Sequence, residues 1–279
     1  MKNAMQLKAI MKNIAKDKNI SAQLVLQNYM MERLLERVSL SEYKDKFIIK
    51  GGFLIASLVG LDTRATMDID ATVKGYPVEE STVREMFKKI CDIQIEDDIT
   101  FSFVNIEEIR EGDKYKGYRV SITADYPPMS VPLKLDITAG DVITPREINY
   151  KYKMMLEDKY IPLLAYNVET ILAEKIETII SRSDQNTRPR DYYDVYIIWK
   201  LKRDEIDFSK LNKALVATAN KRGSQGLLDQ YRSIMDVVKS SETMQSFWNK
   251  YQKSYTYAKD IAFKDTCEAV VEIMSSLNI

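Results

Sequence analysis

Two aspartates separated by one isoleucine, Asp68 and Asp70, have the residue types and spacing that best suit catalysis in this 279-residue chain. The segment MDIDATV that contains them alternates as a β-strand does. Residues two apart on a strand share one face, so both carboxylates project the same way from Cα atoms about 7 Å apart. Carboxylates that close repel each other unless a cation lies between them, and hard divalent ions prefer oxygen ligands. The pair therefore predicts a divalent metal site.

A glycine pair, Gly51 and Gly52, precedes the aspartates and follows the apolar run FIIK. We expect FIIK to be a short buried strand that enters a tight turn, because glycine lets backbone approach backbone or ligand closely. The next segment, FLIASLV, is predicted to form one packed helix. A third acidic residue, Asp136, lies within the apolar run LKLDIT, where an unpaired charge would be costly.

The composition excludes several kinds of chemistry. Histidine is absent, which rules out histidine bases, Ser-His-Asp triads and imidazole metal ligands. The two cysteines, Cys91 and Cys267, are too few for a disulfide framework or a zinc site and fit a reducing cytosol. Lys+Arg 41 against Asp+Glu 41 leaves no overall field to attract a polyanion. Without a long apolar segment or a cleavable leader, the protein is expected to be cytoplasmic and free of the membrane.

The elements that must position these residues change in kind along the chain. Helical spacing covers residues 4–39, where Ser21 is the expected N-cap residue of a second helix. An amphipathic helix is predicted over 79–93. The β-rich runs ITFSFVNIEEI, YKGYRVSITADY and VPLKLDITAG are separated by the turn clusters EGDK and PPMS. Together with FIIK and MDIDATV they predict a mixed sheet of about five strands.

The chain is predicted to be helical again from about Tyr166 to its end. Helices are expected at 167–183, 189–203, 208–220, 227–238, 243–253 and 257–277. The run IPLLAYN, near 160–166, is the candidate domain boundary. We therefore predict a two-lobed α/β protein of the α+β type, with an N-terminal lobe over 1–163 that begins with a helical lead-in, and a helical lobe over 164–279.

Five motifs in order, KGG, RATMDID, KLDI, AEKI and RPRDYYDVY, span residues 50 to 196. This spaced set resembles the AbiEii/AbiGii toxin family of nucleotidyltransferases, the toxin half of type IV toxin–antitoxin and phage-defence systems. The resemblance implies that the N-terminal lobe has the nucleotidyltransferase fold and that the active site lies between the two lobes. It also implies that Asp68, Asp70 and Asp136 bind two Mg²⁺ (or Mn²⁺) ions about 4 Å apart.

The resemblance assigns nucleotide binding to four residues before and within the aspartate motif. Gly51 and Gly52 would let the backbone approach the triphosphate. Arg64 and Thr66 would hold phosphate oxygens with a guanidinium fork and a hydroxyl. The alternatives are a simple tight turn for the glycines and solvated loop positions for Arg64 and Thr66.

Three residues of the helical lobe receive roles from the same resemblance. Lys175 borders the apolar stripe of its helix, so its ammonium can reach a cleft and neutralise nucleotide phosphates; alternatively it pairs with Glu174 or Glu177. Asp191 would orient Lys175 or an arginine, or assist the incoming hydroxyl, although an aspartate in a first helical turn can simply complement the helix dipole. Asp194, three residues later on the same side, is interpreted as a partner for Arg188 or Arg190.

Basic residues cluster around this helix pair and just after it: Arg182, Arg188, Arg190, Lys200, Lys202, Arg203, Lys221 and Arg222. Such a cluster can be a solvated face or a track for RNA phosphates. Tyr192 and Tyr193 lie nearby and could stack on bases, or they could pack in a core.

The expected activity follows from the resemblance. The enzyme would move a nucleoside monophosphate from an NTP to an acceptor hydroxyl, with the tRNA 3′ end as the leading acceptor by analogy. It would act as a growth-inhibiting toxin beside a separately encoded cognate antitoxin. One alternative is protein nucleotidylation on Ser, Thr or Tyr, and another is a non-catalytic module that binds NTPs.

Overall fold

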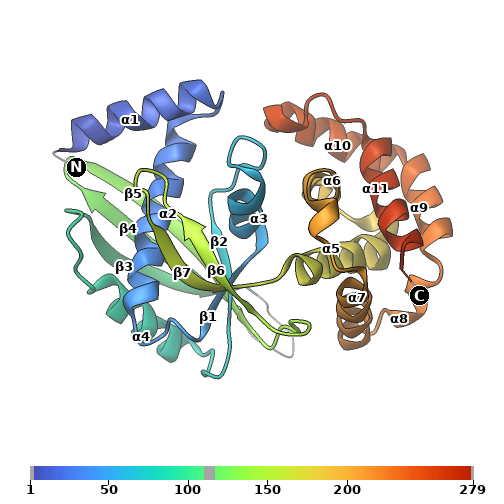
Figure 1. Cartoon of the computed structure of the whole chain (residues 1–279), viewed down its shortest axis with the longest axis horizontal. Coiled ribbons are helices and arrows are strands. Elements are labelled where there is room, and N and C mark those ends of the chain that lie inside the picture. The colour runs from blue at the N-terminus through green and yellow to red at the C-terminus, as the bar shows by residue number, and fades with distance from the viewer. Residues whose placement is uncertain (1–2, 110–116, 278–279) are drawn as a thin grey trace. The chain divides into compact units, whose positions relative to one another are not determined.

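The chain forms two compact units in the computed structural model, which describes residues 3–109 and 117–277 (Figure 1). Unit 1 comprises Met1–Asp141 and Ile148–Ala165. Unit 2 comprises Val142–Glu147 and Tyr166–Ile279. The short segment 142–147 therefore belongs with the C-terminal helices, although strands of unit 1 precede and follow it. The expected turn EGDK, residues 111–114, lies outside the described residues.

Unit 1 is built on a mixed sheet with seven strands in the described part of the chain, in the order β3-β4-β5-β2-β1-β7-β6. The strands are β1 (Phe47–Lys50), β2 (Ile69–Val73), β3 (Thr100–Glu108), β4 (Tyr118–Tyr126), β5 (Met129–Ala139), β6 (Ile148–Lys153) and β7 (Tyr160–Ala165). The predicted α/β fold class is confirmed, but the expected number of strands is wrong. The two additional strands are β6, whose sequence INYKYK is mostly polar, and β7, which contains most of the run interpreted as a domain boundary.

The register of the sheet places four charged residues in one row across neighbouring strands. Arg119 on β4 pairs with Asp136 on β5, and Asp136 pairs with Asp70 on β2. Asp70 in turn pairs with Lys50 on β1. Directly paired residues project to the same face, while their neighbours along each strand project to the other. Because the neighbouring β5 residues Leu135 and Ile137 are fully buried, the charged row lies on the face opposite the apolar core.

Four helices accompany this sheet: α1 (Ala4–Asp17), α2 (Ala22–Leu40), α3 (Gly51–Val59) and α4 (Glu80–Cys91). The helices predicted over 4–39 and 79–93 are confirmed, and the Ser21 side chain caps α2 by accepting from the backbone N–H of Leu24 at 3.1 Å. Helix α2 packs against β5 and β7, and α4 packs against β3 and β4. These contacts bury the apolar residues that alternate with the charged row.

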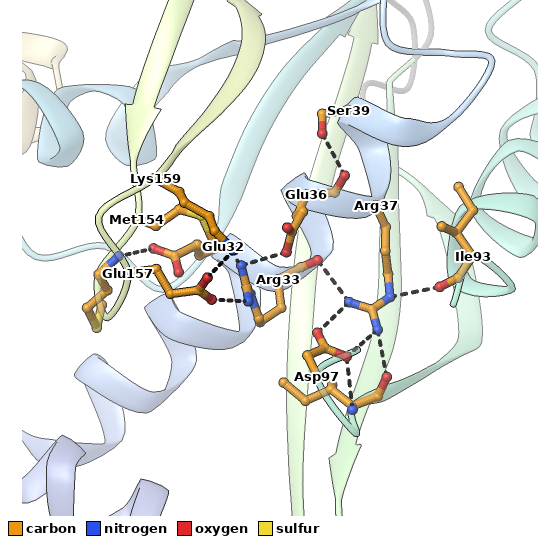
Figure 2. A network of polar contacts seen from close by, with 12 residues as sticks. Glu32, Arg33, Glu36, Arg37, Ser39, Ile93, Asp97, Met154, Glu157 and Lys159 are labelled. Atoms are coloured by element: carbon orange, nitrogen blue, oxygen red, sulfur yellow. Dashed lines mark hydrogen bonds and ion pairs between the residues drawn. The ribbon is translucent and has the colours of Figure 1, made fainter. Parts of the chain in front are cut away.

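A polar network on α2 fixes the turn between β6 and β7 to the body of unit 1 (Figure 2). The guanidinium of Arg33 contacts Glu36 at 2.6 Å and Glu157 at 3.1 Å. Next to it, Glu32 accepts a hydrogen bond of 2.7 Å from the backbone N–H of Met155. One turn further along the helix, Arg37 forms a bidentate pair with Asp97 at 2.8 and 2.9 Å. Since Glu32, Arg33 and Arg37 are buried, their charged or polar groups need such partners.

We expect the stability of unit 1 to depend on the ionisation of Glu32. Burial raises the pKa of this carboxyl from 4.5 to about 7, against the opposing effects of the Met155 N–H and Arg33. Because the pKa of Glu32 is higher in the folded than in the unfolded protein, protonation of Glu32 favours folding. This contribution is fully present below about pH 4.5 and is lost as the pH rises through about 7. The Glu32→Gln variant stays neutral and keeps the acceptor for Met155, so above pH 7 it should be more stable than the parent by about 2–3 kcal/mol.

Urea unfolding at pH 5 and pH 8, followed by circular dichroism, measures this difference. The exposed Glu96 in the same unit offers a matched control, and Glu96→Gln should leave the pH profile unchanged. Equal stability changes for Glu32→Gln at both pH values would contradict the expectation.

Apart from the segment 142–147, unit 2 consists of helices and their connections in its described residues. Its helices are α5 (Val168–Arg182), α6 (Pro189–Lys202), α7 (Phe208–Arg222), α8 (Gln225–Leu228), α9 (Tyr231–Ser240), α10 (Glu242–Ser254) and α11 (Phe263–Ser275). Helix α5 begins as predicted at the cap Asn167, whose side chain accepts from the N–H of Thr170 at 2.7 Å. Both tryptophans of the chain, Trp199 and Trp248, belong to this unit, so tryptophan fluorescence reports on unit 2 alone. Within the described residues, no helix has the length and apolar character needed to cross a membrane.

Candidate active site

The first group of predicted site residues lies at the middle strands of the unit 1 sheet. Strand β2 begins at Ile69, so Asp70 lies on the strand and Asp68 lies one residue before it. The Thr66 hydroxyl donates to the Asp68 carboxylate at 3.1 Å and to the Asp68 carbonyl at 3.2 Å, which holds this residue in place. Asp136, predicted as the third acid, is the cross-strand partner of Asp70. The sheet therefore places Asp70 beside Asp136, and Asp68 lies two residues before Asp70 in the chain.

The glycine pair packs directly on Asp70. Gly51 has a positive φ of 63°, and a Cβ at this position would lie only 2.0 Å from Asp70 Oδ2. The backbone N–H of Gly52 points at the same oxygen, with an N···O distance of 3.4 Å. The two glycines are also the first residues of α3, so the predicted turn is the start of the helix itself. Free N–H groups at a helix start favour an anionic ligand.

Arg64 and Thr66 lie against the other side of this glycine pair. A Cβ added to Gly52 would be 3.1 Å from Thr66 Oγ1 and 3.2 Å from Arg64 Nη2. Both side chains are buried, which excludes the alternative of solvated loop positions. The segment is fixed from α2, because Asn28 donates to the Thr66 carbonyl at 2.8 Å and Gln27 donates to that of Met67 at 2.6 Å.

Two cations at the ends of the charged row were missed by the sequence analysis. Lys50, immediately before the glycines, is buried; its ammonium donates to Thr138 Oγ1 at 2.9 Å and forms an ion pair with Asp141. At the opposite end, Arg119 grips Asp136 with two hydrogen bonds of 2.8 and 2.7 Å. The position of Arg119 could have been predicted from the turn at Pro127 and Pro128. Counting residues away from this turn along β4 and β5 places Arg119 opposite Asp136.

The donor chemistry of the three aspartates fits a hard divalent cation, since carboxylate oxygens are the ligands that Mg²⁺ and Mn²⁺ prefer. Their arrangement fits it only in part. Over residues 3–109 and 117–277, no three acidic or cysteine side chains are already grouped so that they could hold a metal ion. Both oxygens of Asp136 are engaged by Arg119. The Asp68 carboxylate accepts a hydrogen bond from Thr66 and the Asp70 carboxylate accepts one from Gly52, so all three aspartates have partners in this structure.

The second group of predicted residues lies in unit 2, between α5 and α6. The Lys175 ammonium contacts the Asp191 carboxylate at 2.6 Å and the Asp194 carboxylate at 2.9 Å. Both aspartates are fully buried. Burial alone would lower the pKa of Lys175, but Asp194 and Asp191 outweigh it, so this pKa lies above the ordinary value of a lysine. The cluster is a charged lysine between two carboxylates.

These contacts place Asp191 against Lys175, and three interpretations differ from the structure. Asp191 orients Lys175 and also an arginine, because Arg188 lies 3.0 Å from its carboxylate. Arg188 therefore pairs with Asp191 instead of the expected Asp194, which pairs with Lys175.

The alternative partners of Lys175, Glu174 and Glu177, contact Arg222 instead, one member of the basic cluster. Tyr192 and Tyr193 are 0% and 1% exposed, so they are core residues and offer no face for a base.

Comparisons with known proteins bear on the fold and on the family of the chain. No curated protein sequence matches the chain. Two solved structures from Helicobacter pylori resemble it in fold. JHP933 shares 14% sequence identity over 92% of both chains, with a TM-score of 0.54. A protein described as a candidate nucleotidyltransferase shares 15% identity over 92% of this chain and 95% of its own, with a TM-score of 0.50.

A family model described as "Nucleotidyl transferase AbiEii toxin, Type IV TA system" matches residues 33–270, which include both groups of predicted site residues. The chain therefore belongs to the AbiEii family of nucleotidyltransferase toxins of type IV toxin–antitoxin systems.

Proposed function

We propose that this nucleotidyltransferase uses a divalent metal ion to transfer a nucleoside monophosphate from an NTP to the 3′ end of tRNA. The modified tRNA would no longer accept an amino acid, so growth would stop. A cognate antitoxin encoded nearby would oppose this effect, as the membership in a type IV toxin–antitoxin family suggests. Phage defence is the setting that this family suggests for the system.

The observation that carries the proposal is the contact between the glycine pair and Asp70. Gly52 N–H donates to the Asp70 carboxylate, and this contact places the start of α3, with its further backbone N–H donors for phosphate oxygens, beside Asp70. Donors for an anion and ligands for a cation, placed side by side, are what binding of a metal-bound triphosphate requires. Arg64, buried against Gly52, adds a positive charge that supports phosphate binding.

The proposed reaction is an in-line displacement at the α-phosphorus. The acceptor hydroxyl oxygen forms a bond to this phosphorus, the bond to the bridging oxygen breaks, and pyrophosphate leaves with the electron pair while the hydroxyl proton passes to water. A metal held by Asp68 and Asp70, with Asp136 as a third ligand, would neutralise charge that develops on the phosphate oxygens. Thr66 fixes Asp68, and the glycine pair fixes Asp70, so both carboxylates are oriented before the substrate arrives.

Labelled NTP incubated with purified protein and total cell lysate tests the proposal. We expect label in material that RNase destroys and protease spares, with inorganic pyrophosphate released in equal amount. Asp68→Asn should abolish both labelling and growth inhibition. Asp158→Asn is the matched control, because Asp158 lies in the same unit with its side chain 98% exposed, and it should retain both.

Each other outcome has a defined meaning. Label in protease-sensitive material would replace the tRNA acceptor with a protein hydroxyl. NTP binding without any labelling would indicate a non-catalytic binding module. Growth inhibition that survives Asp68→Asn would overturn every catalytic form of the proposal.

A further inference from the structure

The third aspartate of the site is held by a cation that belongs to the chain itself. Arg119 and Asp136 are direct cross-strand partners on β4 and β5. Arg119 Nε donates to one carboxylate oxygen and Nη2 to the other, at 2.8 and 2.7 Å. A bidentate guanidinium pair of this kind occupies the carboxylate in the plane of its two oxygens, where a divalent ion would also bind.

The electrostatics of the surroundings favour this position for the arginine. Asp136 raises the pKa of Arg119 above its ordinary value through hydrogen bonds and charge, and Asp68 and Glu107 act in the same direction. The guanidinium thus interacts with two of the three aspartates assigned to the metal. It supplies positive charge to a group of carboxylates that would otherwise repel each other.

The pair is also open enough to exchange. The Arg119 side chain is 38% exposed and that of Asp136 is 18% exposed. Ion pairs with such access to solvent contribute little net stability, because water and a competing ion can replace either partner. A cation that binds more strongly than the guanidinium can therefore displace it without unfolding the sheet.

We propose that Arg119 is a positioning residue that pairs with the third metal ligand, Asp136, in the metal-free enzyme. It competes with the divalent cation for the Asp136 carboxylate. This inference rests on the proposed function, since it assumes that the aspartates bind a cation. On this view Asp136 can join Asp68 and Asp70 as a metal ligand only after Arg119 has been released, so the arginine sets the concentration of metal at which the site is complete.

Binding of Mn²⁺ without nucleotide, followed by electron paramagnetic resonance of the free ion, tests this competition. Arg119→Gln should bind Mn²⁺ at least about tenfold more tightly than the parent, because one charge-assisted bidentate pair no longer has to be broken. Asp136→Asn should change the affinity of the parent little, but it should remove the gain in the Arg119→Gln background. A purely structural role for Arg119 would lower Mn²⁺ affinity or leave it unchanged.

Arg84→Gln is the matched control. It removes the same charge from a side chain of equal exposure, 39%, whose partner Glu80 lies on α4 and not among the three aspartates. Its Mn²⁺ affinity should equal that of the parent. A comparable gain in Arg84→Gln, or a gain that persists in the Arg119→Gln/Asp136→Asn double variant, would overturn the inference.

Asp70→Asn separates failure of this inference from failure of the proposed function. If Asp70→Asn weakens Mn²⁺ binding while Arg119→Gln does not strengthen it, only the competition is refuted. If neither variant changes Mn²⁺ binding, the aspartates hold no cation, and the metal-dependent function fails with the inference.

Discussion

Replacing Lys175 by methionine is expected to lower the free energy of unfolding of unit 2 by about 3–5 kcal/mol. The ammonium lies 2.6 Å from Asp191 and 2.9 Å from Asp194, and both carboxylates are fully buried. Removing the lysine leaves two like charges in a low-dielectric environment, with Arg188 as the remaining cation at Asp191. A buried pair that loses one partner costs far more than the pair itself contributes, because the remaining charge stays desolvated.

Urea unfolding followed by tryptophan fluorescence measures this loss, since both tryptophans belong to unit 2. Lys210→Met is the control: Lys210 pairs with Asp207 on the surface, with side chains 51% and 43% exposed, and should cost less than about 1 kcal/mol. The triple variant Lys175→Met/Asp191→Asn/Asp194→Asn removes the stranded charges and should recover part of the stability. A triple variant no more stable than Lys175→Met would refute the electrostatic explanation.

Gly51→Ala is expected to reduce nucleotidyl transfer by at least about a hundredfold, because it displaces Asp70 from its position. The new Cβ would lie 2.0 Å from Asp70 Oδ2 and 2.7 Å from Asp70 Cβ. The contact with Asp70 Cβ cannot be relieved by rotating the carboxylate, because the Cβ atom is fixed to the backbone of β2. The positive φ of 63° adds about 1–2 kcal/mol of backbone strain to this steric conflict.

Gly75→Ala separates the two costs. Gly75 has nearly the same φ, 66°, but no atom lies within 4 Å of its added Cβ. This variant should lose stability only through backbone strain and keep its transfer activity. Comparing the stability of the two variants by circular dichroism, and their turnover, isolates the effect of the contact with Asp70. Equal turnover in both variants would show that Gly51 is needed only for its backbone conformation.

The strands and helices that could be predicted were those in which a buried face gives a regular apolar pattern. FIIK predicted β1 because all four of its residues are buried, and the alternation around Asp136 predicted β5 because one face of that strand packs on α2. Strand β6 lies at the sheet edge with mostly exposed residues, so it has no regular apolar pattern, and Pro162 within the apolar run of β7 argues against a strand. The segment 142–147 joins unit 2 through tertiary contacts, such as that of Asn167 with the Thr144 carbonyl, which no local pattern encodes.

The candidate site was predictable where the chemistry lies within one motif. Asp68, Asp70 and the glycine pair are near each other in sequence, and the sheet places Asp136 beside them as expected. Arg119 and Lys50 were missed because their importance depends on strand register and not on residue type. The pairing of Lys175 with Asp194 depends on how α5 and α6 pack, so helical spacing alone pointed to closer but incorrect partners.

The place of β7 in the sheet has a consequence for synthesis on the ribosome. Strand β1, whose residues are all buried, lies between β2 and β7 in the sheet. The ribosome makes β7 roughly a hundred residues after β1, counted from Lys50 to Tyr160. Until Ala165 has emerged, one side of β1 is an unpaired apolar edge, the kind that recruits strands from other chains. Translation products that stop before this point are therefore expected to aggregate through this edge.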